Sequence, residues 1–168
     1  NNLFSVDFRK IYILLVTFKT VYMKNIYETL KEIKECSVFL SLIEKSSMQG
    51  QLSTAKNLTI FVPENKGCAC LEDESFLECN LSNVIKYHMI NDKLKAINLI
   101  PFKLRKTLNG KNVCLEAERV QINASLIIKK DIECSNGYIH IIDAIIVPKD
   151  VSCEPNTNYY NYEKDNWN

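Results

Sequence analysis

The chain has 168 residues, and 46% of them are hydrophobic, which is enough to fill one core and excludes a disordered protein. The 21 basic and 20 acidic residues leave a formal net charge of +1 at pH 7, so whole-chain charge gives no reason to expect nucleic acid or an anionic membrane as a partner. With only four glycines and four prolines, the composition predicts one domain with short extensions rather than a linker-rich chain.

Residues 1–24 allow two interpretations. Arg9 and Lys10 precede an apolar run over residues 11–18, which has the charge order and length of a signal-peptide core. The run is too short to span a bilayer, and no clear small-residue cleavage site appears before Lys24. We therefore expect either a signal-peptide remnant or an N-terminal helix or strand of the domain.

The following segment predicts the first helix, over residues 26–46. Asn25 can cap this helix, and Glu28 three residues further on completes a capping box. The apolar side chains then fall on one stripe, formed by Ile26, Leu30, Ile33, Leu40 and Ile43. Residues 48–56 predict a turn and a short connection.

A short strand and a second helix come next. The strand is predicted over residues 58–62, where Pro63 stops it. Residues 64–75 are irregular and rich in cysteine. Apolar residues recur at helical spacing over residues 81–90, which predicts the second helix, and residues 91–102 predict a further helical turn and a loop.

The rest of the chain has the two-residue period of strands. Residues 106–108 and 112–117 predict a hairpin around Asn109-Gly110, and residues 120–123 and 126–132 continue the sheet. Helices that precede strands favour an α+β domain over alternating βαβ units.

The final predicted strand is the most informative one. Asn136-Gly137 predicts a tight turn with positive φ, the apolar run after it is typical of a strand buried on both faces, and Pro148 ends the run. His140 and Asp143 would lie on opposite faces of a regular strand. This polar pair therefore needs hydrogen-bonding partners or a bulge.

No catalytic motif accompanies the two histidines of the chain, His88 and His140. The sequence has no nucleophile elbow, phosphate loop, metal-protease motif or dinucleotide fingerprint. We therefore expect both imidazoles, together with Asp143, to serve as structural hydrogen-bonding groups rather than as catalytic ones. The sequence predicts neither an enzyme nor a cofactor or metal.

The cysteine content is high for a domain of this size and suggests an oxidising compartment, with at least one of the seven unpaired. The candidates for disulfides are Cys36, Cys68, Cys70, Cys79, Cys114, Cys134 and Cys153. A zinc site is the alternative, but its spacing lacks the short paired knuckles of zinc modules. That site would use Cys68, Cys70, Cys79 and His88.

Two further features concern the compartment and the end of the chain. N-glycosylation sequons begin at Asn57, Asn80 and Asn123, but chance alone would give about two in so Asn-rich a chain, so they support secretion only weakly. Residues 150–168 form an Asn- and Tyr-rich tail without an apolar period, a membrane-spanning run or a lipid-anchor signal. We expect this tail to be loose.

Three landmarks resemble those of the fasciclin domain family of extracellular and cell-surface adhesion proteins. They are "TIFVPEN" at residues 59–65, Tyr87-His88 within "LSNVIKYHMI", and "NGYIHIIDAIIVP" at residues 136–148. They occur in the family's order, and the resemblance covers about residues 25–149. It implies an α+β fold, a β-sandwich-like wedge of strands flanked by helices that lie mainly in the N-terminal half.

The chain departs from the family at Gly67-Cys68, where the first block usually ends in an aromatic anchor. A thiol or half-cystine thus replaces a core ring, and Cys68 or Cys70 could pair with Cys79. The connectivity does not follow from the sequence.

The resemblance also implies a binding function, because integrin recognition in animal members is assigned to an Asp-Ile pair and to the Tyr-His region. The matching residues here are Asp131-Ile132 and Tyr87-His88. We expect a secreted or cell-surface module that binds an integrin-like receptor, a matrix protein or a glycan. The alternatives are a surface-coat or matrix module that self-associates and, less favoured, a zinc or thiol enzyme. His140, Asp143 and Asn136 are expected to be structural polar residues.

Overall fold

The computed structural model describes residues 7–69, 74–99, 103–116, 121–123 and 125–148. Seven strands form one sheet in the order β2-β1-β7-β6-β5-β4-β3. Only β1 and β7 run parallel, and the other neighbours are antiparallel. The strands are β1 (Leu58–Pro63), β2 (Met89–Ile90), β3 (Lys103–Lys106), β4 (Asn112–Glu116), β5 (Gln121–Ile122), β6 (Ser125–Cys134) and β7 (Gly137–Ile142).

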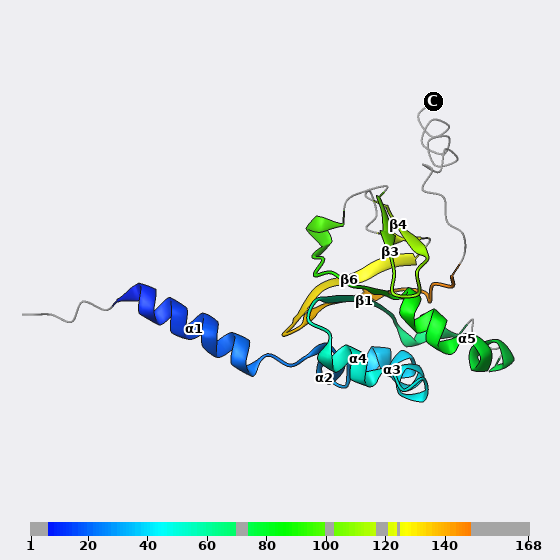
Figure 1. The fold of residues 1–168 in the computed structure, drawn as a ribbon, viewed down its shortest axis with the longest axis horizontal. Coiled ribbons are helices and arrows are strands. Elements are labelled where there is room, and N and C mark those ends of the chain that lie inside the picture. The colour runs from blue at the N-terminus through cyan, green and yellow to red at the C-terminus, as the bar shows by residue number, and fades with distance from the viewer. Residues whose placement is uncertain (1–6, 70–73, 100–102, 117–120, 124, 149–168) are drawn as a thin grey trace, which may run out of the picture.

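The longer helices precede most of the strands, as the sequence predicted. Figure 1 shows α2, α3 and α4 gathered beside β1, while α1 extends away from the domain. The helices are α1 (Phe8–Tyr22), α2 (Ile26–Leu30), α3 (Ser37–Lys45), α4 (Gln49–Thr54) and α5 (Glu74–Tyr87), with 3-10 turns η1 (Lys34–Cys36), η2 (Asn65–Cys68) and η3 (Ala96–Asn98). This mixed architecture confirms the predicted α+β class.

The predicted helix over residues 26–46 is interrupted, although its capping box is present. The predicted helix divides into α2, η1 and α3. The division occurs because a side chain from another part of the chain binds backbone groups at the beginning of α3. The Asn65 side chain accepts from Val38 N (2.9 Å) and donates to Lys34 O (3.2 Å). A distant side chain therefore sets this helix boundary.

Other boundaries also differ from the sequence prediction. The stretch predicted as a turn contains α4, and α5 begins at Glu74 rather than near residue 81. β7 ends at Ile142, well before Pro148. The reason is that its parallel neighbour β1 ends at Pro63, opposite Ile142, so no ladder continues on that side.

The turn before β7 lacks the positive φ angles that Asn136-Gly137 predicted. Neither Asn136 nor Gly137 has a positive φ, and Gly137 already belongs to the strand. A Cβ at Gly137 would lie 1.7 Å from Leu58 O. Glycine is therefore required by the close approach of β1 and not by the turn.

The core lies on both faces of β1 and β7. Ile60 and Ile139 belong to a cluster with the helix residues Phe39 and Leu52, whereas Phe61 belongs to a second cluster on the opposite face. Apart from the half-buried Tyr138, every residue of both strands is buried. This confirms the prediction of a strand buried on both faces.

Candidate functional site

The candidate site lies at a bulge in β6. Ile132 is opposite Ile139 and Lys129 is opposite Ile141, so Lys130 and Asp131 together face His140 alone. Asp131 has φ 60°, in the left-handed region where Asp is among the few residues tolerated. The polar pair of the final strand was expected to need hydrogen-bonding partners or a bulge, and the bulge opposite His140 lies on the neighbouring strand β6.

His140 holds this bulge through its ring. Its Nδ1 accepts a hydrogen bond from Asp131 N (3.1 Å), while its Nε2 donates to Leu94 O (2.8 Å). The ring stacks on Phe61, with 5.4 Å between the ring centroids. Burial lowers the pKa of His140, and the neutral form is the one that can both accept and donate here.

The Asp131 side chain is exposed and fastens a second segment. Its Oδ1 accepts from Ala96 N at 2.7 Å, at the first residue of η3. Thr59 Oγ1 holds the same segment by donating to Asp92 O (2.7 Å) and accepting from Leu94 N (2.9 Å). Side chains from three strands therefore fix residues 92–96 against the sheet.

The residue after the fastened Ala96 carries an exposed apolar side chain. Ile97 follows Ala96 directly and is 88% exposed. Ile132, the apolar residue expected beside Asp131, is instead half-buried against the core. Sequence reasoning missed Ile97 because an isolated apolar residue in a polar stretch has no periodicity, and only the Asp131–Ala96 contact brings it to the site.

Tyr87 and His88 do not reach this surface, since both are completely buried. Tyr87 Oη donates to Asn112 O (2.8 Å) and accepts from Asn123 Nδ2 (3.1 Å). Tyr87 and His88 have no exposed surface and Ile132 is half-buried, so Asp131 is the exposed residue among the four expected contact residues.

His88 is a structural group of the same kind as His140. Its Nδ1 donates to Val84 O (2.8 Å) and its Nε2 accepts from Ile146 N (3.1 Å). Burial lowers the pKa of His88 to about 4. Both ring nitrogens are engaged with the backbone, so His88 has no lone pair for the zinc ion of the alternative site.

Asp143 and Asn136 also bind backbone groups. Asp143 Oδ1 accepts from Leu126 N (2.9 Å) and so closes the end of β7 onto β6. The Asn136 Oδ1 accepts from Ile26 N (2.9 Å), and its Nδ2 donates to Leu52 O (2.7 Å) and Ala55 O (3.1 Å). Asn136 thereby joins α2 and α4 to the turn before β7.

The described cysteines divide into two kinds. Cys114 on β4 is disulfide-bonded, whereas Cys36 and Cys134 are free buried thiols, which corrects their selection as disulfide candidates. Burial raises the pKa of Cys36 to about 12 and also raises that of Cys134, so neither is a reactive thiolate at neutral pH. Cys68 is buried on η2. Cys70, the Cys79 side chain and Cys153 lie outside the described residues.

The sequons differ in accessibility. Asn57 is exposed between α4 and β1. The Asn123 amide is turned inward, where its Oδ1 accepts from Cys114 N (3.0 Å) and its Nδ2 donates to Tyr87 Oη. The side chain of Asn80 lies outside the described residues, as does the tail from residue 149.

The described residues form a sheet domain fastened by buried polar groups, and no group of three or more His, Cys, Asp or Glu side chains among them could hold a metal ion. No helix in the described part of the chain is long and apolar enough to cross a membrane. The architecture is that of an α+β scaffold with a polar, exposed bulge.

Comparison with known proteins identifies the family of this scaffold. The model of the fasciclin domain matches residues 34–148, more than half of the chain, so the chain belongs to the fasciclin domain family. The fold resembles the FAS1 domain pair of the insect cell adhesion molecule Fasciclin I, with a TM-score of 0.63 at 20% identity. That match covers 74% of this chain and 51% of the other.

Two curated relatives are longer proteins that match this chain over part of their length. Human (Homo sapiens) periostin is 30% identical over 140 residues, covering 76% of this chain and 16% of periostin. The fasciclin-like arabinogalactan protein CTB11 of Cercospora beticola is 25% identical over 136 residues, covering 77% of this chain and 36% of that protein. The chain thus spans well under half the length of these two relatives.

Proposed function

We propose that this domain is a non-catalytic adhesion or matrix module, secreted or displayed at a cell surface, whose partner contact is formed by Asp131 and Ile97. The observation that carries the proposal is the exposed Asp131 with its left-handed backbone conformation. Its backbone N donates to His140 Nδ1, and its side chain accepts from Ala96 N. Backbone strain of this kind persists where the surrounding structure holds it and often marks functional positions.

The chemistry of the two side chains defines the class of partner. Among the hydrogen bonds of the described residues, the Asp131 carboxylate uses Oδ1, which leaves Oδ2 for an external ligand. A carboxylate oxygen can complete the coordination of a receptor-bound divalent cation, as an integrin-like receptor would require. Ile97 adds an apolar contact that can be buried in a pocket of the partner.

A protein partner fits this surface better than a glycan. Sugar rings usually pack on exposed aromatic faces, and the half-buried aromatic side chain near the site is Tyr138. Lys95 Nζ already lies 5.6 Å from the centroid of the Tyr138 ring. The ring therefore has an internal cation–π partner and is not an open platform.

Membership of the fasciclin family and the half-cystine at Cys114 support an extracellular location. The FAS1 pair of similar fold comes from a cell adhesion molecule.

The test compares matched variants in binding to a panel of cell surfaces and matrix proteins. Asp131→Asn keeps an oxygen that can accept from Ala96 N but removes the charge, and Glu133→Gln removes an exposed charge two residues further on. We expect about tenfold weaker, chelator-sensitive binding for Asp131→Asn and little change for Glu133→Gln.

A second pair tests the apolar contact. Ile97→Ser should weaken binding to the partner. Ile128→Ser, which changes an exposed isoleucine of β6, should not weaken it. Equal binding by all four variants and the parent would contradict the proposed contact. Concentration-dependent assembly in sedimentation without cell binding would instead favour a self-associating matrix module.

A further inference from the structure

We propose that α1 docks along the surface of an anionic lipid bilayer and holds the domain against it. This inference concerns the apolar side chains of α1 and does not depend on the proposed partner contact. Figure 1 shows α1 projecting from the domain rather than packing on it. Its large apolar side chains are correspondingly open to solvent.

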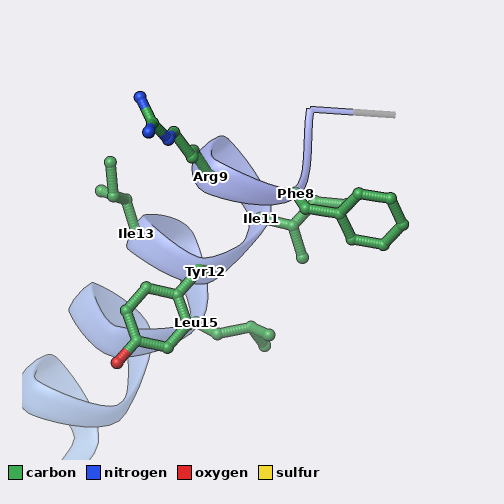
Figure 2. A pocket seen from close by; sticks show the side chains of 6 residues that line it. All are labelled: Phe8, Arg9, Ile11, Tyr12, Ile13 and Leu15. Atoms are coloured by element: carbon green, nitrogen blue, oxygen red, sulfur yellow. The ribbon is translucent and has the colours of Figure 1, made fainter. Parts of the chain in front are cut away.

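One side of α1 is apolar except for Lys19, which lies one helical turn after Leu15. The apolar members of this side recur at intervals of three and four, which places them along one side of a helix, and their exposed fractions run from 45% to 79%. They are Phe8, Ile11, Leu15, Phe18 and Tyr22. Figure 2 shows Phe8, Ile11 and Leu15 on one side of the helix, with Arg9 and Ile13 on the other.

No other described element covers this face. The shallow hollow drawn in Figure 2 is open and is lined by α1 residues alone. The ion pair between Lys19 Nζ and Glu133 Oε2, at 3.2 Å, connects α1 with β6. Because both side chains are well exposed, this pair restrains the helix only weakly.

The charges of α1 identify the surface it would meet. The helix contains Arg9, Lys10 and Lys19 and no acidic residue. Asp7 precedes the helix and accepts from Arg9 N and Lys10 N as its cap. An apolar face combined with an excess of cations is the pattern of helices that lie in the interface of anionic membranes. The net charge of +1 averages over the chain and hides this local excess.

The length and charge of α1 argue against two other roles for this helix, which are crossing a bilayer and pairing with a second copy of the chain. A helix of 15 residues is about 22 Å long, shorter than the hydrocarbon core, so it cannot cross a bilayer. Pairing with a second copy would need about three heptads of apolar seam, whereas α1 has two. It would also bring like charges together.

The test uses the 168-residue chain and vesicles of phosphatidylcholine with and without about one third phosphatidylserine. We expect sedimentation with the anionic vesicles that falls as salt is raised, because exposed charges are screened. The matched variants are Leu15→Gln on the apolar face and Ile13→Gln on the opposite side, whose parent side chains are 64% and 62% exposed.

Leu15→Gln should weaken vesicle binding about tenfold and Ile13→Gln much less, since only Leu15 would be buried in the interface. Both variants should unfold at the parent's denaturant midpoint because both positions are exposed. No vesicle binding, equal loss in both variants, or a Leu15-dependent dimer without vesicle binding would overturn the proposal. Removal of residues 1–24 from the protein exported by cells that express the full chain would overturn it as well, because the segment would then be a leader.

Discussion

The backbone N–H of Asp131 donates to Nδ1 of His140 across 3.1 Å, so the central strand directly holds the bulge on its neighbour. Because Nε2 of the same ring donates to Leu94 O, His140 occupies one neutral tautomer. His88 is arranged in the corresponding way between Val84 O and Ile146 N, with the roles of its two nitrogens exchanged. Both of the protein's histidines are thus structural acceptors that protonation would remove.

The buried, neutral His88 should make the stability of the domain depend on pH in mild acid. Burial lowers the pKa of His88 from 6.5 to about 4, so between these values the unfolded chain binds a proton that the folded chain does not. The contribution of neutral His88 to the free energy of unfolding should therefore be complete above pH 6.5. It should be lost as the pH falls from 6.5 toward 4, which lowers the free energy of unfolding by about 3 kcal/mol.

Urea unfolding at a series of pH values would measure this loss, and NMR would isolate the histidine. The His88 ring protons should titrate near pH 4, well below those of a histidine in the urea-unfolded chain. A His88 titration near 6.5 in the folded protein would rule out the buried neutral ring.

Asp131 should be replaceable by Gly more readily than by Ala. Its φ of 60° strains an alanine by about 1 kcal/mol, whereas glycine adopts this conformation freely. Both substitutions remove the oxygen that accepts from Ala96 N, so the difference between them isolates the backbone term. Chemical denaturation of the two variants measures it, and equal stabilities would contradict a strained bulge.

Gly137→Ala should be severely destabilising, because the added Cβ would lie 1.7 Å from Leu58 O at the centre of the sheet. The matched control is Gly50→Ala in α4, where a Cβ meets nothing within 4 Å. That control should be neutral or stabilising by up to about 1 kcal/mol, since alanine favours a helix. The yield of folded protein and the unfolding midpoint report both effects, and a well-folded Gly137→Ala protein would refute the close approach.

Asn136→Ala removes three side-chain hydrogen bonds that join α2 and α4 to the turn before β7. We expect a loss of about 3 kcal/mol or more, because buried backbone partners are left unsatisfied. Asn57→Ala, at an exposed asparagine, should change stability by less than about 0.5 kcal/mol. Similar denaturation curves for the two variants would mean that Asn136 does not fasten these helices.

Glycosylation should distinguish Asn57 from Asn123 in a eukaryotic secretion host. Asn57 is exposed, whereas a glycan on Asn123 Nδ2 would break its hydrogen bond to Tyr87 Oη in the folded domain. Peptide mass spectrometry should find glycan at Asn57 and an unmodified Asn123. Full occupancy of Asn123 in the folded, secreted protein would show that this inward amide is not required.

Several features could be read from local sequence. The capping box at Asn25, the strand over residues 58–62 and the doubly buried final strand were predicted, because each depends on neighbouring residues only. The break between α2 and α3 and the early end of β7 were not. The first depends on Asn65 and the second on where β1 stops, and both lie far away in the sequence.

The candidate site shows the same division. From the sequence by itself, the family, the α+β class and the need of His140 for a partner or a bulge could be determined, since ordered motifs and apolar periods are properties of the chain. Only the tertiary structure decided that Tyr87 and His88 are buried, and that Asp131 binds the backbone of Ala96, next to the exposed Ile97 in the chain. Exposure and proximity depend on which distant segments pair, and hydrogen bonds from β1, β6 and β7 together place the segment that carries Ile97.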